Sequence, residues 1–295
     1  MESKVKMKIV NNINEKLYAK YKDFFLKILN KNIEILIDFD INLLIKLEKS
    51  IGKQKLCNGE VSAAQMYYDN KKYILILQED SFKRIKYDRG LDLESSIFHE
   101  LIHIYDSYNI MKNKNYHFIL FRKRVKKYDD FVVNIGYRFW TEFLAYFCTY
   151  NRFNFLEKGP TMFQLLKEFE SCEELYKKID LIALNKSDKK MCEDLCDRLD
   201  AFIYALSKHL AYELSVGRRY SYCKKTKKRS SYIFLLKILK NLSKKCGNIY
   251  ENRYKKSMAK NLFMLGLYIL ETIYGYFKIN IVSKSGSIKM AFYSD

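Results

Sequence analysis

The hydrophobic residues of this chain recur mainly at the spacing of an α-helix. In residues 11–29, for example, Leu17, Tyr21 and Phe25 lie four positions apart and would share one side of a helix. Four stretches in the second half of the chain have similar spacing and are predicted helices: 161–178, 187–215, 231–244 and 250–277. The pattern therefore predicts a protein that is mostly helical.

Shorter apolar runs separated by polar turns predict a few β-strands. Residues 32–39 are expected to form a strand, and a helix is expected to follow from Asp40 to about Gly52. Two pairs of runs are each separated by a few turn-forming residues and predict hairpins: 61–68 with 73–78, and 277–283 with 287–293. Together with the helices, these strands place the chain in the α+β class.

One position in the chain is predicted to separate two domains. Pro160 is the only proline of the protein and Gly159 precedes it, so that neither a helix nor a strand is expected to continue through this point. We therefore predict a first domain over residues 1–158, which contains the small sheet. The second domain, residues 159–295, is predicted to be helical with a C-terminal β-hairpin.

The chemically most informative stretch lies within the first domain. His99-Glu100-Leu101-Ile102-His103 uses two of the four histidines of the chain and has the pattern HExxH. Residues four apart lie on the same face of a helix, so that His99 and His103 can direct both imidazoles at one metal ion, with Glu100 beside them. Zinc held in this way activates water, and a neighbouring glutamate can accept a proton from that water. The predicted chemistry is hydrolysis.

The residues around this motif favour a buried helix. An apolar stripe recurs at helical spacing and consists of Leu93, Ile97, Leu101 and Ile104. Imidazoles and a carboxylate beside such a stripe would be costly to bury without partners, which favours a metal ion. An accidental match to the short pattern is the alternative, and in that case the two histidines are structural.

A zinc site needs a third protein ligand, and Glu142 is the best candidate. It lies in an otherwise aromatic and apolar helix, where a carboxylate is expensive to bury unless a cation meets it. Pairing of Glu142 with Arg138, one turn earlier, is the alternative. Asp106 is the rival ligand, but one helix rarely supplies three ligands at tetrahedral angles. We therefore assign to Asp106 a hydrogen bond to a ligand histidine.

Three further residues are weaker candidates for stabilising the transition state of a hydrolysis. Tyr105 and Tyr137 carry hydroxyl groups on the two helices of the predicted site. His117 lies near the start of a predicted basic helix over 115–127. A structural histidine on a solvated basic helix is the alternative for this residue.

These motifs resemble the gluzincin class of zinc metallopeptidases. His99 to His103 followed by Tyr105-Asp106, with the later Glu142-x-x-Ala145, is similar to the mitochondrial processing peptidases that mature an ATP synthase subunit. It is similar, more loosely, to the ImmA/IrrE-type peptidases of mobile elements and stress regulators. The resemblance covers roughly residues 90–150.

The resemblance implies a zincin-like catalytic domain with a small sheet beside the HExxH helix. It implies that Zn²⁺ is bound by His99, His103 and Glu142. Glu100 would be the general base, and the substrate would be a peptide or a protein. The strand over 73–78 would hold an extended substrate by backbone pairing, because it is the last strand before the helix.

The charge of the chain suggests a different function. The sequence has 54 basic and 34 acidic residues, a formal net charge of +20, which would favour nucleic acid or an anionic membrane surface. The lysines are spread over almost every predicted helix, which favours a compositional origin of the charge. The alternative to the peptidase is therefore a basic helical protein that binds nucleic acid or regulates a mobile element, with a structural or inactive HExxH.

Cysteine usage and hydropathy bear on location. The seven cysteines are odd in number and lack zinc-ribbon spacing, so that they are predicted to be reduced. The first ten residues lack the apolar run of a signal peptide. The most apolar run, 262–277, is shorter than a membrane span and contains Glu271. We expect a cytoplasmic protein without a membrane span.

Overall fold

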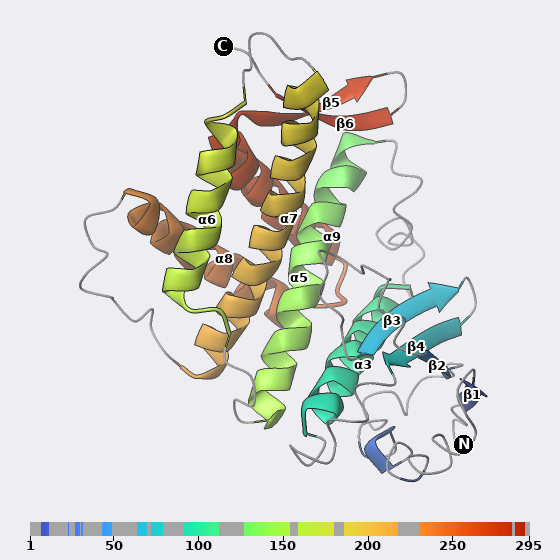
Figure 1. The fold of residues 1–295 in the computed structure, drawn as a ribbon. Coiled ribbons are helices and arrows are strands. Elements are labelled where there is room, and N and C mark those ends of the chain that lie inside the picture. The colour runs from blue at the N-terminus through green and yellow to red at the C-terminus, as the bar shows by residue number, and fades with distance from the viewer. Residues whose placement is uncertain are drawn as a thin grey trace. The chain divides into compact units, whose positions relative to one another are not determined.

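The computed structural model of the chain is mostly helical, as the hydrophobic pattern predicts (Figure 1). It describes residues 7–11, 23, 27–29, 31, 43–48, 64–69, 72–78, 91–111, 127–153, 159–179, 186–217, 230–284 and 287–292. The chain divides into two compact units, 1–108 with 148–156, and 109–147 with 157–295. Residues 109–147 thus group with the later helices, whereas the domain prediction kept them with the first 158 residues.

The first unit contains a sheet whose strand order is β1-β2-β4-β3. The strands are β1 (Met7–Asn11), β2 (Leu43–Glu48), β3 (Ala64–Asp69) and β4 (Lys72–Gln78). β1, β2 and β4 run parallel, and β3 pairs antiparallel with β4 as the hairpin pattern predicts. β4 is therefore an inner strand of this sheet, and β3 lies at its edge among the described strands.

β2 lies where the sequence pattern predicted a helix, so that this prediction is wrong. The strand has a parallel neighbour on each side, β1 and β4. Such inner parallel strands are usually covered on both faces and are near-continuous apolar runs. The run Leu43-Leu44-Ile45 fits that rule as well as it fits one face of a helix. The strand predicted over 32–39 lies outside the described residues. Of the helix predicted over 11–29, residues 23 and 27–29 are described and helical, whereas Asn11 ends β1, so that the predicted start of this helix is wrong.

The second unit consists mainly of long helices. They are most of α5 (Tyr128–Phe153), then α6 (Met162–Tyr176), α7 (Lys186–Ser215), α8 (Ser230–Glu251) and α9 (Met258–Ile269). The start of α6 is set locally by a capping box, because the Thr161 hydroxyl accepts from the Gln164 N–H while the Gln164 side chain accepts from the Thr161 N–H. In Figure 1, α7 runs between α5 and α6.

The helix predicted over 250–277 is broken in the structure. α8 continues to Glu251 and α9 begins at Met258, with Tyr254 between them at a left-handed φ of 62°. Neither glycine nor proline marks this break, which is why the pattern missed it. α9 passes into a π-helical turn, Leu270–Tyr274, and a 3₁₀ turn, Gly275–Phe277. The predicted C-terminal hairpin follows as β5 (Ile279–Lys284) paired with β6 (Ser287–Phe292).

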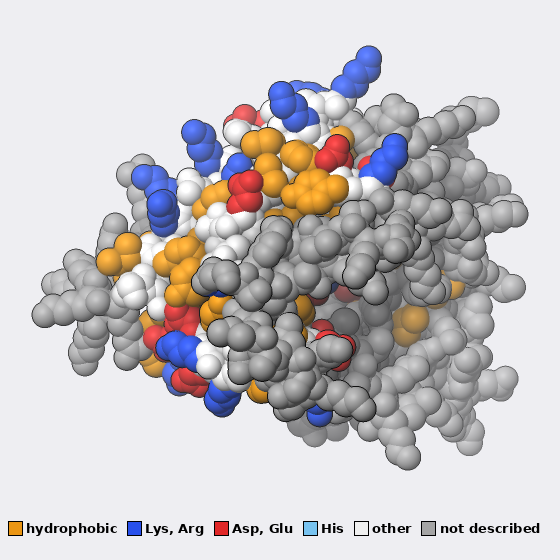
Figure 2. Space-filling view, turned by 90° about the horizontal axis from the view of Figure 1, so that it is seen from above, with side chains coloured by type: hydrophobic (Ala, Val, Ile, Leu, Met, Phe, Trp, Pro, Cys, Tyr) orange, Lys and Arg blue, Asp and Glu red, His pale blue; other side chains and the backbone are white. Residues whose placement is uncertain are grey.

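Some hydrophobic side chains remain at the surface between the charged ones (Figure 2). Ile233 is 59% exposed and Phe163 is 55% exposed. Lys167 lies 4.8 Å from the ring centroid of Phe163 and partly covers it. In the described part of the chain, none of the helices combines the length and the apolar character that crossing a bilayer requires.

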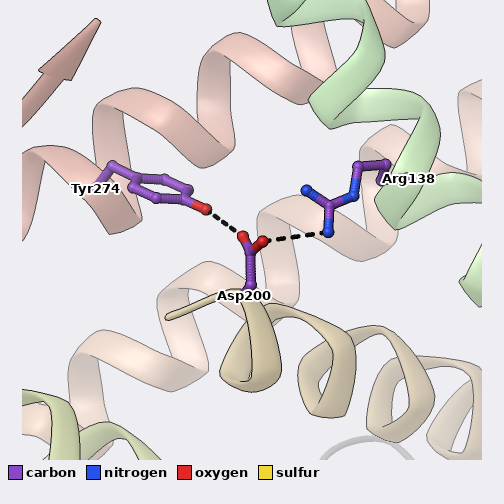
Figure 3. Close-up of polar contacts among 3 residues, drawn as sticks. All are labelled: Arg138, Asp200 and Tyr274. Carbon is purple, nitrogen blue, oxygen red and sulfur yellow. Dashed lines mark hydrogen bonds and ion pairs between the residues drawn. The ribbon is translucent and has the colours of Figure 1, made fainter. Parts of the chain in front are cut away.

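Two polar contacts join α5 to α7 within the second unit. The Asp200 carboxylate of α7 accepts a hydrogen bond from Arg138 of α5 at 3.2 Å and another from the buried Tyr274 hydroxyl at 2.7 Å (Figure 3). Two turns further along α5, the Tyr146 hydroxyl is hydrogen-bonded to that of Tyr204. Tyr274 belongs to the π-helical turn, so that this turn is tied to both helices through one carboxylate.

α5 and α9 touch backbone to backbone where two glycines face each other. A Cβ atom on Gly136 would lie 2.0 Å from the carbonyl oxygen of Leu262, and one on Gly266 would lie 1.9 Å from that of Val132. Both oxygens belong to helix backbones and cannot rotate away as a side chain can. Only glycine therefore fits at either position.

The cysteines of the described residues are thiols outside any disulfide: Cys148, Cys172, Cys192, Cys196 and Cys246. Burial raises the pKa of the Cys172 thiol to about 12, so that this group stays protonated at neutral pH. Cys172 and Cys246 are buried as core residues. Cys57 and Cys223 lie outside the described residues.

His209 makes folding stability depend on pH. It is buried on α7, where its Nδ1–H donates to the carbonyl of Pro160, and burial lowers its pKa from the ordinary value of 6.5. Below about pH 6.5 this histidine is protonated in the unfolded chain but stays neutral in the folded chain. The free energy of unfolding should therefore fall as the pH drops below about 6.5. We expect urea titrations of the wild type to show this loss, at up to about 1.4 kcal/mol per pH unit.

The matched variant for this prediction is His209→Asn, which keeps an N–H donor but does not titrate. Between pH 7.5 and 5.5 its stability should fall less than that of the wild type. Parallel pH profiles for the two proteins would contradict the assignment to His209.

Candidate metal centre

The HExxH residues lie on α3 (Leu91–Met111), the long helix of the first unit. The stripe predicted to be apolar and buried is buried throughout: Leu93, Ile97, Leu101 and Ile104. Near its start the helix is joined to Lys31, whose Nζ lies 2.9 Å from the Glu94 carboxylate. The side chains of the motif therefore project from a helix whose rotation is set by its buried stripe.

The last turn of α5 supports this helix beside the first histidine. Phe98 packs edge-on against Phe153, with ring centroids 5.6 Å apart. The Arg152 guanidinium lies over the Phe98 ring at 4.6 Å. Phe98 precedes His99 in the chain, so that these contacts restrain the backbone from which the imidazole projects.

The two imidazoles meet at their Nε2 atoms. These atoms are 3.0 Å apart, and the rings are inclined by 79° to each other. A tetrahedral zinc ion with Zn–N distances of about 2.0–2.1 Å would hold its nitrogen ligands about 3.3 Å apart. A small ring rotation would suffice to accept a metal between them, whereas without a metal one Nε2–H can donate to the other nitrogen. His103 is buried and His99 is half-buried.

Glu100 lies beside the imidazoles and is half-buried. One ligand atom from each of His99, Glu100 and His103 can be chosen so that all lie within 4.8 Å of one another. The residues of the motif thus form a compact group that could hold a metal ion. Its donor set, two imidazole nitrogens and a carboxylate, suits zinc and other divalent transition metals.

The sheet contributes a backbone group to this cluster. The Met66 N–H of β3 donates to Oε2 of Glu100 at 2.7 Å. Backbone groups of successive residues alternate in direction along an antiparallel strand, so that those of Ala64 and Tyr68 face the same edge as Met66. The edge of β3 therefore lies beside Glu100.

This arrangement corrects the prediction that the strand over 73–78 would hold a substrate. That strand is β4, and both of its edges are already paired, with β2 and β3. Sequence reasoning missed Met66 because its contribution is a backbone N–H, which no side-chain pattern reveals. The hairpin register was the available signal, since strands that end at Asp69 and resume at Lys72 direct Met66 away from β4.

Two other candidates from the sequence lie on the same helix as the HExxH histidines. Asp106 is fully buried one turn after His103, where a carboxylate must be paired or hydrogen-bonded. Tyr105 is half-buried. The hydrogen bond from a ligand histidine to Asp106 and the catalytic role of Tyr105 stay predictions.

The remaining candidates belong to other parts of the chain. Glu142 and Tyr137 lie on the part of α5 that groups with the second unit, where Glu142 is half-buried and Tyr137 is buried. Arg138, the alternative partner of Glu142, forms its ion pair with Asp200 of α7. The role of Glu142 as third ligand stays a prediction. His117 lies outside the described residues.

Comparison with known protein families, with curated proteins and with solved structures finds no match to this chain. The functional interpretation therefore rests on the cluster of His99, Glu100 and His103 and on the residues around it.

Proposed function

We propose that this protein is a zinc-dependent peptidase of the gluzincin kind. The observation that carries the proposal is the meeting of the His99 and His103 Nε2 atoms 3.0 Å apart, with the Glu100 carboxylate in the same cluster. Two imidazole nitrogens and a carboxylate that converge on one point are a donor set that suits zinc. The HExxH spacing and the later Glu142-x-x-Ala145 support the same interpretation.

Each residue of the cluster then has a distinct task. When bound, zinc would supply Lewis-acid activation and lower the pKa of water towards about 7. His99 and His103 would present neutral nitrogen lone pairs to it. Glu100 would accept a proton from the attacking water and pass it to the leaving amine. The Met66 N–H, which donates to the Glu100 carboxylate at 2.7 Å, would fix the orientation of that carboxylate for the proton transfer.

A peptide substrate suits the edge strand beside the cluster. Apart from the Met66 N–H, which is donated to Glu100, the outward backbone groups of β3 would pair with an extended chain, and such pairing is independent of the side chains of that chain. Ala64 and Tyr68 flank Met66 at this edge, which brings the pairing positions next to Glu100. In this proposal β3 takes the substrate-pairing role that the resemblance to zincins implied for residues 73–78.

Metal content is the first test of the proposed function. Protein purified after expression in zinc-supplemented medium should contain about one zinc per chain, measured by inductively coupled plasma mass spectrometry. His103→Ala should lose it, because removing one of two imidazole ligands opens the site. His209→Asn, a change at the buried histidine of α7, is the control and should keep the metal. Wild type and His103→Ala with the same trace metal would contradict the proposal.

The third ligand is tested separately. If Glu142 completes the site, Glu142→Ala should lose zinc, whereas Asp106→Ala should weaken zinc binding by roughly 10- to 100-fold as expected of a group that only orients a ligand. Glu168→Ala, an exposed change on α6, is the matched control for lost negative charge. Competition with a zinc chelator measures the affinities. Full zinc affinity in Glu142→Ala, with zinc lost in Asp106→Ala, would transfer the role of third ligand to Asp106.

A further inference from the structure

Acidic residues are scarce in the segment that contains α8 and α9. Residues 231–270 include eight basic residues and one acidic residue, a net charge of +7. Residues 162–200, which contain α6 and the first half of α7, include seven basic and ten acidic residues. The two segments therefore differ in net charge because their acidic residues differ, while their basic residues are spread evenly, as the sequence pattern suggested.

Three of these lysines form one stripe on the solvent face of α8. Lys237, Lys240 and Lys244 are all exposed, and their spacing of three and four residues places them on the same side of the helix. The opposite side is the buried core face, formed by Leu235, Ile238, Leu239, Leu242, Cys246 and Ile249. Among the described residues, no carboxylate is paired with any of the three lysines.

The stripe is long enough to meet more than one backbone phosphate. Seven residues of helix separate Lys237 from Lys244, which is about 10 Å at 1.5 Å per residue. One strand of a nucleic-acid duplex rises about 3.4 Å per phosphate while it winds around the axis, so that neighbouring phosphates lie farther apart than this rise and the long lysine side chains reach out to them. Each lysine that meets a phosphate would release condensed counterions on binding.

The surroundings of the stripe favour a duplex over a single strand. Single-stranded nucleic acid is usually held by exposed aromatic rings on which bases stack. The exposed aromatic residue near the end of α8 is Tyr250, and its ring is already covered by Arg253 at 4.2 Å and contacts Phe147 edge-on at 5.7 Å. A phosphate backbone needs no such ring.

A membrane surface is the less suitable partner for this face. A helix that lies on a bilayer inserts its apolar side into the lipid. The apolar side of α8 is instead buried in the second unit. Apart from the exposed Ile233, only the lysines would be left to meet a lipid surface.

We propose that the Lys237, Lys240 and Lys244 face of α8 binds the phosphate backbone of double-stranded nucleic acid without reading its sequence. This binding is independent of the proposed metal site, since none of its residues belongs to the first unit. It would bring the protein to a nucleic acid and leave the chemistry of the HExxH cluster unchanged.

The test is the salt dependence of binding to a fluorescently labelled 20-base-pair duplex, followed by anisotropy with the full-length protein. Affinity should fall steeply with salt, and Lys237→Gln/Lys240→Gln/Lys244→Gln should bind on the order of 100-fold more weakly at 0.1 M salt. The slope of log affinity against log salt should become shallower by about 2 to 3. Thermal unfolding should be nearly unchanged, because exposed substitutions have small effects on stability.

The matched control is Lys177→Gln/Lys178→Gln/Lys190→Gln, which removes the same charge from exposed positions on and beside α6 and α7. It should shift the slope by less than 1. Equal losses in the two triple variants would overturn the proposal, because net charge alone would then explain the binding. It would also be overturned by absence of duplex binding, or by binding of the α8 lysines to phosphatidylserine vesicles but not to the duplex.

Discussion

Glu100→Gln is expected to retain zinc and to hydrolyse peptides roughly 10²- to 10⁴-fold more slowly than the wild type. This is the contribution to the rate that a general base usually makes. Gln has nearly the same shape as Glu, and its side-chain oxygen can still accept the Met66 N–H, which donates to Glu100 at 2.7 Å in the wild type. The variant therefore keeps the helix, the two imidazoles and the strand contact. What it removes is the ability to accept a proton from water at neutral pH.

A mixed peptide library allows cleavage to be measured without a defined substrate. Wild type and variant can be incubated with the library, and new termini can be counted by mass spectrometry in the presence and absence of a zinc chelator. Glu94→Gln is the matched control on the same helix, since it makes the same exchange of a carboxylate for an amide at a residue that pairs with Lys31 and is itself 13% exposed. Thermal unfolding of both variants shows whether either exchange disturbs the helix.

Equal cleavage by the wild type and Glu100→Gln would remove the mechanism, even if both proteins bind zinc. Cleavage that persists in the chelator would point to a contaminating or metal-independent activity. If zinc binds but neither protein cleaves any peptide, the metal site would be structural. These three outcomes test zinc binding and peptide hydrolysis separately.

Gly136→Ala and Gly266→Ala should each lower the free energy of unfolding by roughly 3 kcal/mol or more. Their added Cβ atoms would lie 2.0 and 1.9 Å from carbonyl oxygens of the opposing helix. A contact this short can be relieved only if α5 and α9 move apart, and that movement would loosen the packing on both sides of the crossing. Urea denaturation followed by far-ultraviolet circular dichroism measures the change.

Gly247→Ala is the control for the general effect of alanine in a helix. Gly247 lies exposed on α8, and a Cβ atom there meets nothing within 4 Å. This variant should be more stable than the wild type by about 0.5–1 kcal/mol, because alanine loses less backbone entropy on folding. A matching gain at Gly136 or Gly266 would contradict the close crossing.

The double variant tests whether the two glycines serve the same contact. Once one alanine has separated the helices, the second should cost much less than it does alone, so that the two effects are not additive. Additive losses would mean that the two positions are strained independently. The crossing in the structure predicts strong coupling, because Gly266 N lies 2.9 Å from the Cβ position of Gly136.

Features that depend on neighbours in the chain were predictable from the sequence. The HExxH spacing places His99 and His103 on one helical face, and the apolar stripe that turns α3 inward is buried as expected. The capping box of Thr161 and Gln164 sets the start of α6 at the start of the helix predicted over 161–178. α7 begins and ends within one residue of the predicted helix over 187–215. In each case the interacting residues lie three or four positions apart, and helix geometry alone brings them together.

Features that depend on distant segments were decided only by the tertiary structure. Residues 43–48 became a strand because β1 and β4 lie on either side of them, and the same apolar run could have packed as a helix. Nothing in the sequence near Glu100 specifies that Met66 donates to it from 34 residues away. The need for glycine at positions 136 and 266 arises only from the close contact between α5 and α9. Packing of the apolar face of α8 is what leaves the face with its three lysines exposed to solvent. Such contacts join residues far apart in the chain, and local propensity and periodicity carry no information about which distant segments will pair.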